Sequence, residues 1–572
     1  MSSAIIGAKK KSPASQHGGG VRGDSLDRRS PSFEGRFGRM FRSLPAAEWP
    51  KQALVDLGKK LTADPESSGD LPSASAEDPK KRIQDDEENA GIPAGYTYLG
   101  QFIDHDITFD PSSSLMQQND PDALVDFRTP RLDLDSLYGR GPADQPFMYS
   151  ADGRKFRLGR ALTENGKPSM ARDLPRFVDP NDPNGAQRAL IGDKRNDENV
   201  IISQLHSAMI QLHNRFADRD GSAPFEKIQQ RVRWYYQWVV VNDFLVKICG
   251  EEVVHDILPH LGAGQPIWKN LPHFAFYKWH EDPFMPIEFS AAAYRFGHSM
   301  VRPIYRLNTE LAGGDDPGKA TKDEEARGLA GRFFIFAGVQ KRGLNGFDEF
   351  PSQWAIDWSL FFDIKGSINK VGKERVQPAY KIDTSLVNPL GFLPEFSTPP
   401  AKPNPPMTVE QLQSVPKDSK GDPSNLAERN LLRGMAMGLP SGQSVALAMG
   451  VDPIDDENLR IGKAVVADWD KNKPLASFHS SFTKNAPLWF YVLAEAQWEW
   501  IQRAKAKGGK GDEEPLKLGT VGARIVAETL IGLLWGDGHS YIRQAPNWMP
   551  EHGIRTMGDL IDFALTGASA KH

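Results

Sequence analysis

One hexapeptide constrains the fold and the chemistry of this chain more than any other segment: Gln101-Phe102-Ile103-Asp104-His105-Asp106. If the segment is helical, Gln101, Asp104 and His105 lie at positions i, i+3 and i+4 and share one face. The side chain of Asp106 lies about 100° further around the helix and serves a different neighbour. An amide, a carboxylate and an imidazole on one face indicate a chemical site. A solvated helix face with a chance histidine is the alternative for a hexapeptide taken alone.

Three further motifs follow in order along the chain: Arg195-Asn196-Asp197-Glu198, Tyr294-Arg295-Phe296-Gly297-His298 and Asn430-Leu431-Leu432-Arg433-Gly434. Together with the hexapeptide they resemble the animal-type heme peroxidases of the peroxidase–cyclooxygenase superfamily, the group of myeloperoxidase, lactoperoxidase and their bacterial relatives. The resemblance runs from Gly95 to Gly538, which is most of the chain beyond residue 90. Any one motif would be weak evidence, whereas four in the same order are strong.

The resemblance implies a mainly α fold, a large single-domain helical heme peroxidase fold with little β structure, over residues 91–572. Apolar residues recur at helical spacing in residues 201–216 and 229–249. In the first of these helices, His206 and His213 lie seven positions apart; a metal site is conceivable there, but roles in the core are commoner. Residues 1–35 are expected to be a disordered tail, and residues 36–90 an N-terminal arm and linker with a short docking helix near residues 46–61.

Charge and cysteine content limit the functional classes. The net charge of −5, with 25% charged residues, lacks the basic surface that nucleic-acid binding needs. The single cysteine, Cys249, excludes an intrachain disulfide framework, unlike the secreted animal members, and indicates a reducing compartment. No apolar run approaches 18 residues, so no transmembrane segment is expected. No signal peptide is recognised, so we expect a cytoplasmic location, with leaderless secretion left open. The oligomeric state is not determined by the sequence.

The distal side of a heme peroxidase needs a base and a cation. The base takes a proton from the near oxygen of the peroxide and returns it to the departing oxygen, while the cation stabilises developing charge. His105 suits the first task because its pKa lies near neutral pH, and Arg195 suits the second because it is always charged. Gln101 would hydrogen-bond the water or small anion above the iron.

The proximal side needs an axial ligand for the iron, and His298 fits this role. Gly297 would let the backbone approach the macrocycle, and Arg295 could pair with a heme propionate. The far nitrogen of the ligand needs an acceptor, which the amide oxygen of Asn430 would supply. The resemblance implies that Arg433 meets a propionate.

The cofactor implied by the resemblance is heme b. Asp104 and Glu198 match the two carboxylates that form ester bonds to heme methyl groups in animal members; plain hydrogen bonding or solvation is the alternative role. Residue 199 is asparagine, whereas myeloperoxidase carries a methionine there that forms a sulfonium bond to heme. We therefore expect this third link to be absent.

A calcium ion is the second expected cofactor. The segment of residues 129–138 resembles the calcium loop of the family, and its alternating oxygen donors suit a hard cation. The alternative is an ordinary acidic turn. The expected ligands are Asp106 from the distal helix, Thr129, the carbonyl of Arg131, Asp133 and Asp135.

The function expected from these features is that of a heme peroxidase, which uses hydrogen peroxide to oxidise small donors. Bromide, iodide, thiocyanate and phenolic or aromatic donors are candidates, whereas chloride is doubtful without the sulfonium bond. The first alternative is a heme-dependent fatty-acid dioxygenase of the same superfamily, which needs a tyrosine three residues before the proximal histidine. That position is Arg295 here, and Tyr294 lies about 100° away on a helix. The second is a non-enzymatic heme-bearing interaction protein, against which the complete catalytic set argues.

Overall fold

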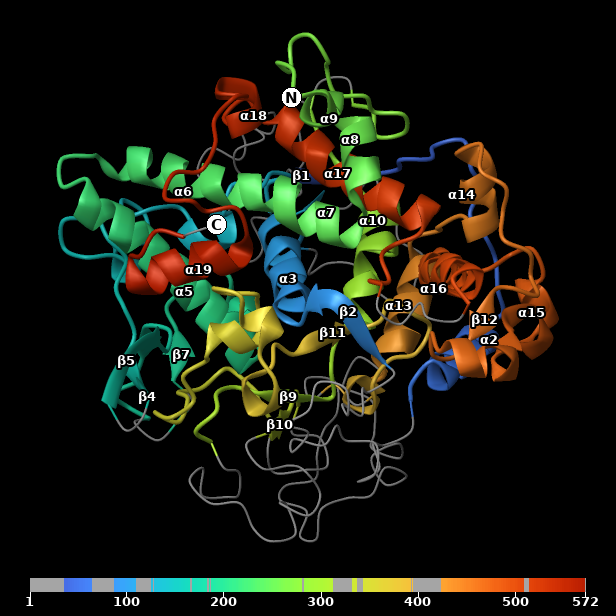
Figure 1. Ribbon diagram of the computed structural model, residues 1–572, viewed down its shortest axis with the longest axis horizontal. Helices are drawn as coiled ribbons and strands as arrows, with labels where there is room; N and C mark the ends of the chain where they lie inside the picture. The colour runs from blue at the N-terminus through green and yellow to red at the C-terminus, as the bar shows by residue number, and fades with distance from the viewer. Residues whose placement is uncertain are drawn as a thin grey trace, which may run out of the picture.

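The computed structural model describes residues 35–63, 87–109, 125–126, 128–164, 167–182, 185, 187–279, 282–311, 332–336, 343–391, 393, 423–508 and 514–570. Helices dominate these ranges (Figure 1), which confirms the predicted mainly α fold. The predicted tail, residues 1–35, lies outside the described residues except for Gly35, as does the part of the predicted linker from residue 64 to residue 86.

The longer helices build the body of the molecule: α2 (Lys51–Lys60), α3 (Gly95–Ile107), α5 (Val200–Arg219), α6 (Phe225–Val239), α13 (Leu426–Ala436), α16 (Leu488–Ala506), α17 (Thr520–Gly536) and α19 (Met557–Thr566). Shorter helices connect them: α4 (Asp135–Tyr138), α7 (Leu245–Ile248), α8 (Glu251–Ile257), α9 (Pro259–Ala263), α10 (Ile287–Ser290), α14 (Gly442–Ala448), α15 (Leu475–Phe478) and α18 (Tyr541–Gln544). Two short helical turns, η4 (Lys194–Asp197) and η6 (Ala293–His298), carry motifs that the sequence singled out.

The described strands are two to six residues long and form small separate sheets: β1 (Gly35–Gly38), β2 (Glu88–Pro93), β3 (Val125–Asp126), β4 (Ala161–Glu164), β5 (Lys167–Arg172), β6 (Arg176–Phe177), β7 (Arg188–Ala189), β8 (Met285–Pro286), β9 (Ile304–Arg306), β10 (Arg332–Phe334), β11 (Pro378–Tyr380), β12 (Arg460–Ile461) and β13 (Lys473–Pro474). β1 lies between β3 and β8, antiparallel to the first and parallel to the second. The remaining strands pair antiparallel in twos: β9 with β10, β2 with β11, β12 with β13, β4 with β5 and β6 with β7.

The predicted N-terminal arm packs on the helical body. Through β1 it joins a strand that precedes the proximal motif, and through α2 it contacts α13. A Cβ atom at Gly58 would lie 2.7 Å from the backbone nitrogen of Glu428, so the missing side chain permits the close approach of the two helices. The arm thereby supports α13, the helix that carries Asn430.

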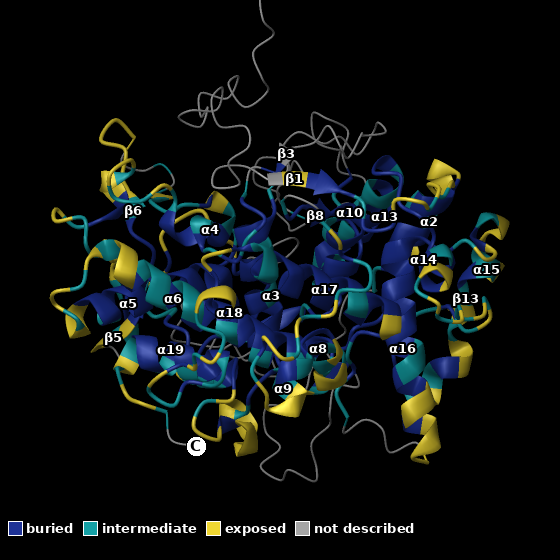
Figure 2. Cartoon of the chain, turned by 90° about the horizontal axis from the view of Figure 1, so that it is seen from above, coloured by how far each residue is buried: buried dark blue, intermediate teal, exposed yellow. Residues whose placement is uncertain are grey.

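The centre of the fold is apolar. α3 runs through the middle of the molecule (Figure 1), and Phe102 and Ile103 on it are fully buried. Figure 2 shows α17 mostly dark blue, whereas the end of α16 reaches solvent. None of the helices in the described ranges combines the length and the apolar character that a membrane span needs.

Candidate active site

A single cavity collects the predicted distal residues and, of the predicted proximal residues, Arg295 and His298, whereas Asn430 and Arg433 are not among the described residues that line it. Its volume is about 320 Å³, within the range of about 300–1,000 Å³ typical of small-molecule and cofactor sites. Helix α3 contributes Gln101, Asp104 and His105, which therefore share one face as their spacing predicts, and η6 contributes His298. Two histidines far apart in the sequence thus line the same space.

His105 is held from behind by Asn196. Its Nδ1 lies 2.8 Å from the Oδ1 of Asn196, which immediately follows Arg195 in η4. The imidazole is only 5% exposed. Burial, assisted by the positive charge of Arg195, lowers the pKa of His105 to about 4. The imidazole is therefore neutral near pH 7 and can accept a proton.

Arg195 lines the cavity but is also anchored to its own loop. Its Nη2 donates to Asp193 at 2.7 Å and to the backbone oxygen of His105 at 3.0 Å, and its guanidinium lies 4.8 Å from the ring centre of Phe109. Burial alone would raise the pKa of Asp193, but Arg195 and Arg128 hold it well below its usual range. The cation is thus fixed in place by a permanent carboxylate.

Gln101 has partners within the protein. Its amide nitrogen donates to Glu198, and its amide oxygen lies 3.5 Å from the side-chain nitrogen of Asn199. The predicted contact with a water or anion above the iron stays a prediction. Glu198 and Asp104 both line the cavity, and the hydroxyl of Thr108 donates to Asp104 at 3.0 Å. The two candidate ester-forming carboxylates therefore face the same space from different elements.

The proximal hydrogen bond has a different polarity from the predicted one. Asn430 lies next to His298, but it is the Nδ2 of Asn430 that lies 2.8 Å from the Nδ1 of His298. The amide oxygen instead accepts a hydrogen bond from Arg295 at 3.3 Å, so the expectation that this oxygen faces the histidine is wrong. An imidazole that binds iron through Nε2 keeps its proton on Nδ1. Iron ligation would therefore require the amide to turn over and Arg295 to release it.

Arg429, which the sequence reasoning missed, lines the cavity. Its Nη1 also donates to the backbone oxygen of Pro423 at 3.2 Å. Arg433, one turn further along α13, is not among the residues that line this cavity in the described part of the chain. The i, i+4 spacing from Arg433 was the signal that could have identified Arg429.

The rest of the cavity wall is apolar and includes Met300, Val301, Ile335, Phe336, Leu390, Leu393 and Leu426. Tyr294 also lines the cavity: its hydroxyl donates to the backbone oxygen of Gly100 at 3.2 Å, and its ring stacks on Phe289 at 4.5 Å. The cavity is therefore lined by both charged or polar side chains and apolar ones.

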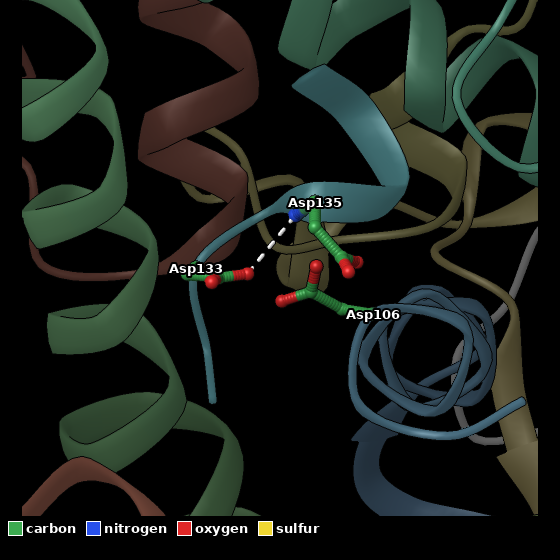
Figure 3. Close-up of side chains that lie close together, drawn as sticks. All are labelled: Asp106, Asp133 and Asp135. Atoms are coloured by element: carbon green, nitrogen blue, oxygen red, sulfur yellow. Dashed lines mark hydrogen bonds between the residues drawn. The ribbon is translucent and has the colours of Figure 1, made fainter. Parts of the chain in front are cut away.

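A second group of polar residues lies behind the distal helix (Figure 3). Asp106, Asp133 and Asp135, here called the three-aspartate cluster, each place one carboxylate oxygen within 4.8 Å of the other two. Burial and the mutual repulsion of the carboxylates raise the pKa of Asp106 and of Asp135. The hydroxyl of Thr129 donates to Asp133 at 2.9 Å. The Arg131 guanidinium lies 3.8 Å from Asp537, and calcium ligation by the Arg131 carbonyl stays a prediction. Four of the five predicted calcium ligands are thus joined by contacts.

Comparison with known proteins identifies the relationship. Residues 116–325 match the family model described as animal haem peroxidase. Heme peroxidase 2 of Caenorhabditis elegans is 25% identical over 322 residues, which cover 44% of this chain and 42% of that protein. Thyroid peroxidase of Sus scrofa is 28% identical over 195 residues, or 31% of this chain and 19% of that protein. The chain is related to the animal haem peroxidases. It spans less than half the length of these curated relatives.

Solved structures support the same fold. Peroxidase A from Dictyostelium discoideum aligns with a TM-score of 0.54 at 14% identity, over 95% of this chain and 96% of that chain. A fatty acid alpha-dioxygenase from Arabidopsis thaliana aligns with a TM-score of 0.50 at 13% identity, over 94% of this chain and 77% of that chain. At such identities the likeness concerns the fold alone.

Relatedness to the animal haem peroxidases implies a heme cofactor, and the donor set of the cavity fits one. His298 offers an imidazole nitrogen for iron, Arg295 and Arg429 offer positive charge for propionates, and the apolar wall suits a macrocycle. A Cβ atom at Gly297 would meet nothing within 4 Å, so there is open space directly beside His298. Burial, assisted by Arg295, lowers the pKa of His298 to about 3, which keeps the imidazole in the neutral form that binds metals.

Proposed function

We propose that this chain is a heme peroxidase that reduces hydrogen peroxide in the cavity between α3 and η6 and oxidises a small donor. The observation that carries the proposal is that a neutral imidazole, a fixed guanidinium and a second imidazole all line one cavity. With phenolic or aromatic donors, one hydrogen peroxide takes up two electrons and two protons to give two waters, and two donor molecules lose one electron each. With a halide or thiocyanate ion X−, one ion supplies both electrons, and hydrogen peroxide, X− and one proton give HOX and one water.

The residues of the cavity divide the work. A heme bound in this cavity would supply the redox chemistry that cleaves the O–O bond of the peroxide. The Nε2 of His105 accepts the proton of the near oxygen and returns it to the far oxygen, which leaves as water. The charge of Arg195, held by Asp193, stabilises the negative charge that develops as the bond breaks. His298 would bind the iron of the heme.

Ester links to heme are part of the proposal. Asp104 and Glu198 support it because both carboxylates line the cavity. Each link would join a carboxyl oxygen to a heme methyl carbon, and the hydrogen and electrons lost would convert one hydrogen peroxide to two waters. The chemistry therefore requires no oxidant beyond the proposed substrate.

The donor class follows from Asn199. This residue lines the cavity where a methionine would be needed for a sulfonium bond to heme. We therefore propose bromide, iodide, thiocyanate or phenolic and aromatic donors, rather than chloride. The apolar wall favours the aromatic class, because it offers contact surface to a planar donor.

A bound calcium ion is proposed at the three-aspartate cluster. The supporting observation is electrostatic: three carboxylates converge behind α3, and the burial of Asp106 makes their mutual repulsion costly. A hard divalent cation with oxygen ligands would remove this repulsion. Because Asp106 adjoins His105, the ion would also fix the end of the distal helix.

A fatty-acid dioxygenase is the second candidate, and Tyr294 is the observation that favours it. Tyr294 lies four positions before His298, a spacing that puts both side chains on one helix face, and it lines the cavity together with apolar side chains. A dioxygenase would add O2 to the hydrocarbon chain of a fatty acid without a reducing donor. Oxygen consumption with a long-chain fatty acid, lost in Tyr294→Phe, distinguishes this candidate from a peroxidase.

The test of the proposed function uses full-length protein reconstituted with hemin. The wild type should show the spectrum of a histidine-ligated heme, should change it rapidly on addition of peroxide and should oxidise iodide or a phenol. His298→Ala should lose stable heme binding, whereas His105→Ala should keep heme and react with peroxide about 10²–10⁴-fold more slowly. Full activity in both variants would show that the site is elsewhere.

A further inference from the structure

A hydrogen-bonded relay leads from the cavity into the core through the amide of Asn196. The Oδ1 of Asn196 lies 2.8 Å from the Nδ1 of His105, and its Nδ2 lies 3.0 Å from the Nδ1 of His206 on α5. Asn196 and His206 are both fully buried, and the ring of Phe102 covers His206 edge-on at 6.1 Å. Asn196 and His206 are therefore shielded from water, whereas His105 faces the cavity.

The amide dictates which nitrogen of each imidazole carries a proton. An amide oxygen only accepts hydrogen bonds, and an amide nitrogen only donates them. His105 must therefore carry its proton on Nδ1, which leaves the lone pair of Nε2 as its proton-accepting site. His206 must accept at Nδ1 and carry its own proton on Nε2. Burial lowers the pKa of His206 to about 3, so this imidazole is neutral and offers one donor and one acceptor.

The opposite arrangement would disable the base. If the amide of Asn196 turned by half a rotation, both hydrogen bonds could form again, with protons on the Nε2 of His105 and the Nδ1 of His206. His105 could then no longer accept a proton at Nε2. The number of hydrogen bonds is the same in both arrangements, but only one of them leaves a general base in the cavity.

We propose that Asn196 and His206 are positioning residues that hold His105 in the Nδ1-protonated form required of a general base. This inference rests on the proposed peroxidase function. Neither residue touches the substrate, because both act through His105. The Nε2 of His206 is buried without a hydrogen-bond partner among the described residues. Unpartnered buried polar atoms are rare. The Nε2 of His206 has no acceptor in the described part of the chain that would place a proton on it, so the hydrogen bond that Nδ1 accepts from Asn196 decides that the proton is on Nε2.

Three substitutions distinguish a role of the relay in positioning His105 from a role in packing alone, with the rate of the reaction with peroxide as the measured quantity. Asn196→Asp replaces the amide by a carboxylate that accepts at both oxygens, so His105 keeps its proton on Nδ1 and the rate with peroxide should stay within about tenfold of wild type. Asn196→Leu removes the hold on both rings, and the rate should fall about 100-fold or more, the usual contribution of a positioned base. His206→Leu leaves the amide held at one end only and should cost about 10–100-fold, as outer-shell partners typically do.

The double variant is the decisive measurement. A carboxylate has no donor end and cannot turn the wrong way, so His206→Leu should lose most of its effect on the peroxide rate in the Asn196→Asp background. A purely structural role of His206 would cost the same in both backgrounds. His213→Leu is the matched control: this histidine lies two turns along α5, is equally buried and bonds Tyr138 and Arg154, outside the relay. It should destabilise the fold without a selective loss of the peroxide reaction.

The rate of carbon monoxide binding distinguishes a loss of proton transfer from a structural disturbance of the cavity. The binding of carbon monoxide to the reduced heme protein needs no base, so the rate should be unchanged in every relay variant. An equal loss with carbon monoxide and peroxide in Asn196→Leu would overturn the inference, and so would a peroxide rate unaffected by Asn196→Leu and His206→Leu.

The tautomer can also be measured without heme. Nitrogen-15 spectra of heme-free protein should show His105 protonated on Nδ1 in the wild type and a loss of this preference in Asn196→Leu. A wild-type His105 protonated on Nε2 would refute the relay. Failure of hemin-loaded wild type to react with peroxide would instead refute the proposed function, while the heme-free spectra would still test the relay.

Discussion

Gly58→Ala should destabilise the protein, although it improves the local helix propensity. In an exposed helix interior, alanine is favoured over glycine by about 1 kcal/mol. Here a Cβ atom would lie 2.7 Å from both the backbone nitrogen and the Cα of Glu428 in α13. Backbone atoms cannot rotate away, so α2 and α13 must separate. Overpacking of this kind costs about 1–3 kcal/mol, which exceeds the propensity gain over most of that range and leaves a net loss of about 1 kcal/mol.

Two quantities are measured for this variant: its stability against unfolding and its affinity for hemin. Urea or thermal unfolding should shift to milder conditions, and hemin affinity should fall, because Asn430 follows Glu428 by two residues on the displaced helix. Gly221→Ala is the control, since a Cβ atom there meets nothing within 4 Å, and its stability should change by no more than about 0.5 kcal/mol. A Gly58→Ala protein about 1 kcal/mol more stable than wild type would refute the argument, because propensity would then have outweighed packing.

Three other perturbations test separate parts of the molecule. Removal of divalent cations with a chelator should lower the melting temperature and slow the peroxide reaction, and unchanged values after verified metal removal would leave the three-aspartate cluster a plain turn. Acid-acetone should extract heme from protein never exposed to peroxide but leave some attached after brief peroxide treatment; Asp104→Ala and Glu198→Ala should each remove one link. Burial raises the pKa of Glu495 to about 8. This group therefore stabilises the fold fully below about pH 4, its unfolded range, and less as the pH rises toward 8; Glu495→Gln should flatten that part of the stability curve in urea titrations at varied pH.

The parts of the site that were predictable depend on local geometry. Helical spacing alone places Gln101, Asp104 and His105 on one face, and the structure has them lining one cavity. Arg195 and Glu198, three positions apart, likewise line it together. Helix geometry is fixed by the backbone, so a short motif carries this information without knowledge of the rest of the fold.

The parts that were missed depend on contacts between distant segments. Asn196 meets His105, 91 positions away, and His206 only because η4 packs against both α3 and α5. The orientation of the Asn430 amide depends on Arg295, from another element altogether. Such partners are set by tertiary packing, and residue spacing in the sequence contains no record of them.

The sequence predicts one continuous helix over residues 229–249, but its periodicity does not reveal an irregular turn within that helix. α6 is followed by a π-helical turn, η5 (Val240–Phe244), before α7 resumes the α-helical path. Asp243 in this turn is buried and accepts hydrogen bonds from the Tyr96 hydroxyl at 2.7 Å and from the backbone of Met557 at 2.8 Å. One carboxylate therefore ties the first turn of α3 to the first residue of α19.

The hydrogen bond between Asp243 and Tyr96 links the π-helical turn to the helix that carries His105. Tyr96 lies at the start of the helix whose other end carries His105, and it lines the cavity itself. A hydrogen bond to a charged group contributes about 1.5–3 kcal/mol, more than a neutral one. Burial raises the pKa of Asp243 to about 6, so the carboxylate is largely ionised near pH 7. The π-helical turn interrupts the regular α-helical spacing. It also carries Asp243, whose hydrogen bond to Tyr96 fixes the start of α3.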